Sequence, residues 1–320
     1  MSRQPPAPLL GHLAYPVLLA ALVTVAVLTV RREWDQGTVS ALFMIGTLTC
    51  LVALERAIPH DRSWHPDRRE WRWYGVYFGL SVIGTAVGQG VVATLAGTLA
   101  GPGSLLPLGG EIPVALLATS LVGYGVHRLG HTNPWLWRVH GLHHVPEKVN
   151  VGNTGVNHIL DVALSQAASQ FALAVTGFSG NCVFVVGLVV IVQGYFSHTN
   201  AEVRLGWLNH VVVGPEQHRL HHSTDLAEAG HYATDLSLWD HVFGSFTWRP
   251  GRRPAAVGVV DPSSFPGTGE VIASLAHPWR RSAVPARPAP ADGEPGTGGQ
   301  AGGRGSGTSE VVPSGQRTRA

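Results

Sequence analysis

Long runs without a charged residue constrain this chain more than any other feature. Residues 12–30, 38–54, 73–110 and 162–197 contain no Asp, Glu, Lys or Arg. Charged residues make up 13% of the 320-residue sequence, about half of the roughly 25% found in globular proteins. Because about 20 apolar residues of helix cross a bilayer, these runs predict an all-α, polytopic membrane helical bundle.

The apolar runs predict six hydrophobic helices, of which at least four should span the membrane. They are expected near residues 12–30, 38–56, 74–99, 112–130, 158–177 and 181–198. The first is too long for the apolar core of a signal peptide, so we expect a retained anchor. The fifth is the least apolar, and it should either bury a polar face against its neighbours or enter the membrane partly.

Composition divides the chain into four parts. We expect N-terminal membrane helices over 1–110, a histidine-rich catalytic membrane domain over 111–250 and a C-terminal extension over 251–284. Residues 285–320 are rich in Pro, Gly, Ala and Ser, a composition that predicts a disordered tail. Cys50 and Cys182 lie in apolar runs outside any CxxC motif, so no disulfide or cysteine metal site is expected. The net charge of +2 gives no reason to expect a nucleic-acid partner.

Histidines arrive in three compact groups between the apolar runs. The groups are HRLGH with His127 and His131, HGLHH with His140, His143 and His144, and HRLHH with His218, His221 and His222. Offsets of three and four residues place side chains on one face of a helix, so each group can aim two or three imidazoles at one point. Eight imidazoles exceed what one four-coordinate zinc would take. The pattern therefore predicts two metal ions, or one metal with a crowded surrounding shell.

Other polar residues near these groups are weaker candidates. His158, at the start of the fifth helix, and His198, at the end of the sixth, lie where further ligands could come from. His210 is expected to be a surface bystander. Metal-bound imidazoles usually donate their second N–H to a carboxylate or carbonyl, so the nearby carboxylates are candidates to orient ligands. These are Asp225, Glu228, Asp235 and Asp240.

Arginine placement predicts the orientation. The loop after the second helix carries five arginines, whereas the connections near residues 101–110 and 179–181 carry no charge. Because positive loops stay on the cytoplasmic side, all the histidine groups should form a helical cap at the cytoplasmic face. The segment 133–157 is then a polar region outside the membrane, with HGLHH on a short helix.

The order of motifs resembles the fatty acid hydroxylase and sterol desaturase superfamily of integral-membrane di-iron oxygenases. The resemblance covers roughly residues 112–248 and includes a WDxxFG segment at 239–244. It implies that His158 and His198 are also ligands, which brings the set to ten imidazoles. His158 is followed by Ile159 where the family typically has proline, and His231 stands where the family often has asparagine.

The resemblance implies a non-haem di-iron oxygenase that uses O2 to hydroxylate an unactivated C–H bond of a lipid or an isoprenoid or sterol-like substrate. Electrons would come from a separate ferredoxin, or from a cytochrome with its reductase. Three alternatives remain: a desaturase on the same iron pair, a zinc-dependent membrane hydrolase, and a non-catalytic metal carrier. Spacing of imidazoles by itself predicts only metal binding.

Overall fold

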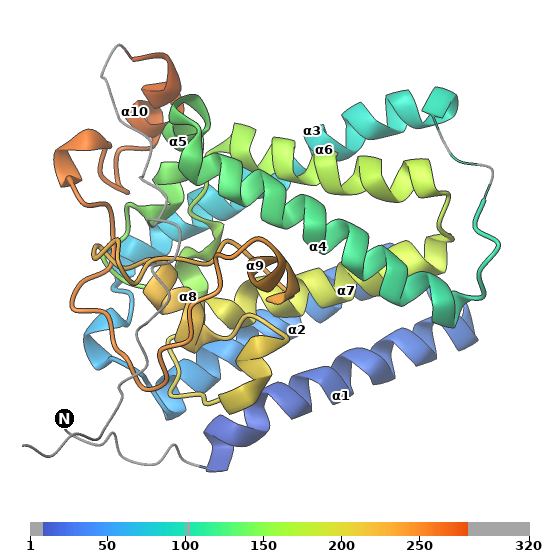
Figure 1. The fold of residues 1–320 in the computed structure, drawn as a ribbon, viewed down its shortest axis with the longest axis horizontal. Coiled ribbons are helices and arrows are strands. Elements are labelled where there is room, and N and C mark those ends of the chain that lie inside the picture. Colours follow the sequence, from blue (N-terminus) through green and yellow to red (C-terminus); the bar gives the residue numbers. More distant parts are fainter. Residues whose placement is uncertain (1–8, 100, 102, 281–320) are drawn as a thin grey trace, which may run out of the picture.

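Six long apolar helices form the body of the protein in the computed structural model, which describes residues 9–99, 101 and 103–280 (Figure 1). All six are long and apolar enough to cross a membrane. They are α1 (Leu9–Arg32), α2 (Gln36–Ala57), α3 (Arg68–Leu99), α4 (Leu108–Thr132), α6 (Ile159–Thr176) and α7 (Gly180–Ser197). The six predicted helices are thus confirmed, and the chain is a multi-pass membrane protein. The predicted tail 285–320 lies outside the described residues.

Local capping explains where several of these helices begin and end. The Asp67 carboxylate accepts hydrogen bonds from the backbone N–H groups of Arg69 and Glu70. These bonds satisfy N–H groups that the first turn of a helix leaves unpaired, so α3 starts at Arg68, six residues before the predicted helix. Ser179 caps α7 in the same way. At the other end of α6, Gly177 adopts a left-handed backbone with φ of 69°, a conformation that favours glycine.

The bundle is held together where small residues let helices approach closely. α6 lies against α3 and α4, and α7 lies against α1, α2 and α4 (Figure 1). A Cβ atom placed on Gly88 of α3 would lie 2.6 Å from the Ala163 carbonyl oxygen of α6. Glycine therefore permits this close contact between the two helices.

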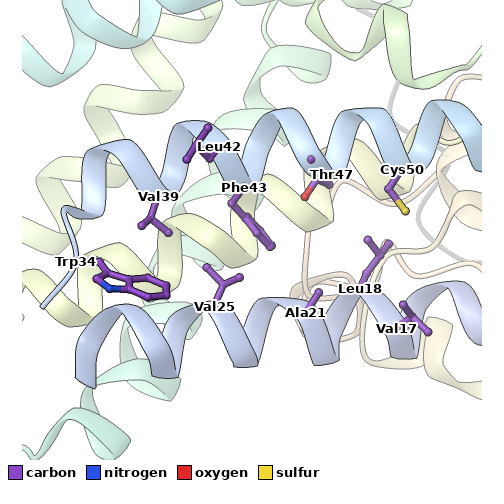
Figure 2. Close-up of a pocket in the computed structure, with 11 residues that line it drawn as sticks. Val17, Leu18, Ala21, Val25, Trp34, Val39, Leu42, Phe43, Thr47 and Cys50 are labelled. Carbon is purple, nitrogen blue, oxygen red and sulfur yellow. The ribbon is translucent and has the colours of Figure 1, made fainter. Parts of the chain in front are cut away.

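α1 and α2 enclose a hollow of about 520 Å³ on the outer side of the bundle (Figure 2). Trp34, Val25 and Phe43 point into it between the two helices. Its remaining lining is Val17, Leu18, Ala21, Val39, Leu42, Gly46, Thr47 and Cys50. This almost wholly apolar surface fits the hydrocarbon region that the length of the helices requires.

Every histidine-bearing segment lies at one end of the bundle. α4 and α7 end there and α6 begins there, together with α5 (Pro134–His140) and α8 (Pro215–His221), as Figure 1 shows. α9 (Leu238–Val242) and α10 (Val271–Ala276) complete this end. α5 stops at His140, and residues 141–144 continue as a 3-10 turn, so HGLHH does not lie on one continuous helix as expected. A helical cap nevertheless carries the histidines.

Candidate metal centre

Eight of the predicted ligands form two groups of four buried imidazoles. Within each group, one ring nitrogen from every histidine lies within 4.8 Å of the others. The first group is His127, His131, His140 and His144, and the second is His143, His198, His218 and His222. Among the residues that the structure describes, each group is dense enough in nitrogen donors to hold one metal ion.

The two groups touch because each HxxHH motif serves both. Histidines four residues apart lie in the same group, as their offset predicts. The middle histidine of each HxxHH motif points away from that group. His143 joins the second group although His140 and His144 belong to the first. The ring of His221 lies 4.7 Å from that of His131 in the first group, while His222 belongs to the second. Adjacent helical residues point about 100° apart, so the two HH pairs bridge the groups.

Hydrogen bonds determine which ring nitrogen of several histidines faces the centre of its group. The Nδ1 atoms of His127 and His143 lie 2.6 Å and 3.2 Å from the backbone carbonyl oxygens of Tyr232 and Val156. A carbonyl only accepts, so each Nδ1 carries the proton and each Nε2 keeps its lone pair. Such second hydrogen bonds are typical of histidines that bind metal.

His140 has the strongest partner of this kind. Its Nδ1 lies 3.0 Å from an oxygen of Asp161, and both side chains are buried. The carboxylate accepts the Nδ1 proton, so the Nε2 of His140, which has no hydrogen-bond partner, is left as a donor to a metal. A carboxylate in this position orients the ring and raises its basicity as a ligand.

The inward nitrogens fit a metal ion. The Nε2 atoms of His143 and His198 are 3.1 Å apart, and those of His127 and His131 are 3.3 Å apart. Two imidazole nitrogens about 2.1 Å from one ion at a right angle lie roughly 3 Å from each other. Neither nitrogen of the buried His144 ring has a hydrogen-bond partner. A buried polar atom without a partner is costly, so the unprotonated nitrogen of this ring is available to a cation.

Burial also keeps the rings uncharged. Desolvation lowers the pKa of His143 to about 4. It lowers the pKa values of His144, His198, His218 and His221 well below the usual range of histidine. Neutral imidazole is the form that binds metal.

The structure does not bring His158 to the two groups. Its Nδ1 accepts a hydrogen bond from the Leu160 N–H and caps α6, and its Nε2 lies 3.1 Å from the Leu275 carbonyl oxygen. Both ring nitrogens are therefore engaged in holding α6 and α10. We leave His158 out of the ligand set that we propose.

Replacing His158 with alanine tests this placement. We expect metal content to stay at the wild-type level and the free energy of unfolding to fall by about 2 kcal/mol, because a helix cap and the hydrogen bond to the Leu275 carbonyl are lost. Metal analysis together with thermal unfolding in detergent measures both. Asparagine at this position restores a cap and should recover stability. Loss of metal in both variants would instead make His158 a ligand.

Asp161 was not among the carboxylates that we expected to orient ligands. The expected carboxylates have other partners. Asp235 bonds Ser120, and Glu228 bonds Ser223 and Arg252. Asp240 accepts hydrogen bonds from the Tyr232 and Ala233 N–H groups. It thereby fixes the backbone that holds His127 and acts on the ligands only indirectly. Asp225 accepts a hydrogen bond from the Ala227 N–H.

His231 and His210 also lie outside the groups of four. His231 has a positive φ of 50°, a conformation that Asn, Asp and His adopt more readily than other residues with a Cβ. Its Nε2 lies 2.8 Å from the Gln217 carbonyl oxygen, so it supports α8 next to His218. His210 is exposed and stacks on His241, as expected for a bystander.

The fold and site define a multi-pass membrane protein with a buried polyhistidine centre able to bind metal. Residues 112–245 match the family model of fatty acid hydroxylase. The match covers less than half of the chain, and over that segment the chain is similar to this family. Together with the relatives named next, it indicates an oxidoreductase of the fatty acid hydroxylase type.

Named relatives agree with this similarity. The ornithine lipid hydroxylase OlsE of Rhizobium tropici is 27% identical over 291 residues, which cover 85% of this chain and 84% of the relative. The human alkylglycerol monooxygenase is 29% identical over 140 residues, or 41% of this chain and 29% of the relative. The fatty acid hydroxylase vlmA of a Lecanicillium species is 24% identical over 149 residues and matches 41% of its length. No solved structure is significantly similar to the chain.

Proposed function

We propose that this membrane hydroxylase holds two iron ions and hydroxylates an aliphatic carbon of an amphipathic lipid. The observation that carries the proposal is the pair of four-histidine groups in direct contact. His143, His198, His218 and His222 would hold one ion. His127, His131, His140 and His144 would hold the other, with His221 beside them.

The protein's own residues position the site and exclude water. Asp161 and the Val156 and Tyr232 carbonyls orient three of the imidazoles. The histidines of both groups are buried. Iron bound there would supply an oxidant strong enough to cleave an unactivated C–H bond, which amino-acid side chains lack.

Electron balance requires a partner. Hydroxylation consumes one O2, two electrons and two protons, and it leaves one oxygen atom in the product and the other in water. The electrons would come from a ferredoxin, or from a cytochrome with its reductase. We place the docking side at the cytoplasm, where loops rich in arginine stay. Five arginines lie at or near the end of the bundle that carries the histidines: Arg56, Arg62, Arg68, Arg69 and Arg72.

The substrate class follows from relatives of different kinds. Their names specify an ornithine lipid, alkylglycerols and fatty acids, which share a long alkyl chain on a polar head. OlsE aligns along most of both chains, so ornithine lipids are the first substrates to test. A substrate of this form could stay in the bilayer while its reacting carbon reaches the histidine end.

Turnover with labelled oxygen tests the function. The full chain in lipid nanodiscs would receive a ferredoxin, its reductase, NADPH and extracted bacterial lipids under isotopically labelled O2. We expect a product that contains one labelled oxygen atom, detected by mass spectrometry. A product that lacks two hydrogens and has no label would indicate the desaturase, and conversion under nitrogen without a donor would indicate the zinc hydrolase.

A further inference from the structure

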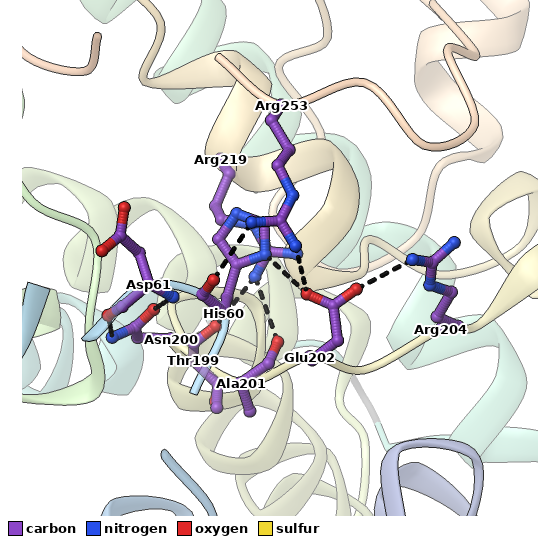
Figure 3. Close-up of polar contacts among 9 residues, drawn as sticks. All are labelled: His60, Asp61, Thr199, Asn200, Ala201, Glu202, Arg204, Arg219 and Arg253. Carbon is purple, nitrogen blue, oxygen red and sulfur yellow. Dashed lines mark hydrogen bonds and ion pairs between the residues drawn. The ribbon is translucent and has the colours of Figure 1, made fainter. Parts of the chain in front are cut away.

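A buried arginine lies inside the HRLHH motif. Arg219, between His218 and Leu220 on α8, is only 4% exposed. Its Nη1 donates to the carbonyl oxygens of Thr199 and Ala201, at 3.2 Å and 3.3 Å (Figure 3). A buried guanidinium is costly unless its protons find partners, so these two carbonyls stabilise its position.

The two carbonyls belong to the segment that follows a ligand. His198 ends α7, and Thr199 is the next residue, with its backbone N–H bonded to the Phe196 carbonyl. Arg219 therefore ties the end of α7 to α8, which carries His218 and is followed at its C-cap by His222. It connects elements that are distant in sequence but supply three of the four imidazoles in the second group.

The position of the His198 ring depends on this tie more than the positions of the His140 and His143 rings do. The Nδ1 atoms of His140 and His143 are held by Asp161 and by the Val156 carbonyl. The Nδ1 of His198 has no hydrogen-bond partner. Nothing bonded to that atom fixes the ring, so its place relative to α8 is set by packing and by the backbone that Arg219 holds.

Other charged residues surround Arg219. Glu202 in the same segment binds Arg204 and Arg253, each at 2.9 Å, and the Nδ1 of His60 at 3.0 Å (Figure 3). Burial raises the pKa of Glu202, but its hydrogen bonds and cationic neighbours lower it further, to about 2. Burial lowers the pKa of Arg219 to about 10. The arginine is thus charged near neutral pH, beside an ionised carboxylate.

We propose that Arg219 is a positioning residue for the second metal site, holding His198 at the distance from His218 and His222 that one ion requires. The proposal rests on the metal centre proposed above. It assigns to Arg219 no contact with metal or substrate, and it predicts an effect on one of the two sites.

Metal titration of the full chain in detergent tests the assignment. Ferrous iron alone would be titrated anaerobically against a competing chelator into the wild type, Arg219→Met and Arg219→Lys. We expect two tight sites in the wild type, and in Arg219→Met one unchanged site and one weakened about 10- to 100-fold, the range seen when groups supporting a ligand are removed. Lysine keeps the charge without the planar fork, so Arg219→Lys should be intermediate.

Matched variants separate positioning from folding. Arg253→Met removes an arginine from the same cluster but spares both carbonyls, and it should keep two tight sites. His131→Ala, in the first group, should weaken the other site, so that its combination with Arg219→Met leaves no tight site. Equal weakening of both sites in Arg219→Met, or no weakening, would overturn the role of Arg219 and leave the proposed metal centre standing. A wild type with fewer than two sites would overturn the proposed centre as well.

Discussion

Replacing His222 with alanine is expected to remove metal from the second group and to lower hydroxylation by about two orders of magnitude or more. The Nε2 of His222 lies 3.1 Å from that of His218, and its ring stacks at 4.3 Å on His144 of the first group. Its loss should therefore disturb both groups. Metal content per chain and the rate of product formation measure the effect.

His210 provides the matched control for that variant. It is an exposed histidine at the end of a short 3-10 helix, and its ring stacks on His241 and contacts Phe246. His210→Ala should retain metal and activity. Both variants should insert in the membrane and purify as well as the wild type, since neither changes an apolar span. Equal damage from the two substitutions would contradict the division into ligands and bystanders.

Replacing Asp161 with asparagine is expected to weaken metal binding at the first group about 10- to 100-fold. Asparagine has nearly the same shape but no charge, so it cannot hold the proton of His140 Nδ1 with a charged acceptor. The second group should keep its affinity, because Asp161 bonds only His140 among the imidazoles of the two groups. Chelator competition resolves the two affinities.

Glu70→Gln is the control for the charge that Asp161→Asn removes. Glu70 pairs with Lys148 at 2.8 Å, and both side chains are more than a quarter exposed. Exposed pairs contribute little to stability, and we expect unchanged metal affinity. If Asp161→Asn also bound both ions as tightly as the wild type, the hydrogen bond to His140 would have no part in metal binding.

Apolar runs were sufficient to predict the helices, because the bilayer imposes length and lack of charge on each one. The start of α3 was not predicted, since its first turn is charged and depends on a cap from Asp67. The 3-10 turn after His140 was also not predicted. Such turns depend on contacts with the rest of the fold, which no pattern of residue types contains.

The histidines could be grouped by motif but not assigned to sites. Which group takes His143 or His221 depends on how α5, α7 and α8 meet, and sequence offsets say nothing about that. Likewise, only the structure places His158 at a helix cap. Asp161 did give a signal in the sequence: it is an ionisable residue at the edge of an apolar run, where such residues are rare and functional.

Metal analysis of the full chain, purified without oxygen from cells grown with iron, tests the central claim most directly. We expect two iron ions per chain and a Mössbauer spectrum of nitrogen-ligated, non-haem iron, with both ions required for oxygen-dependent turnover. A chain that carries zinc and remains fully active without oxygen would contradict it.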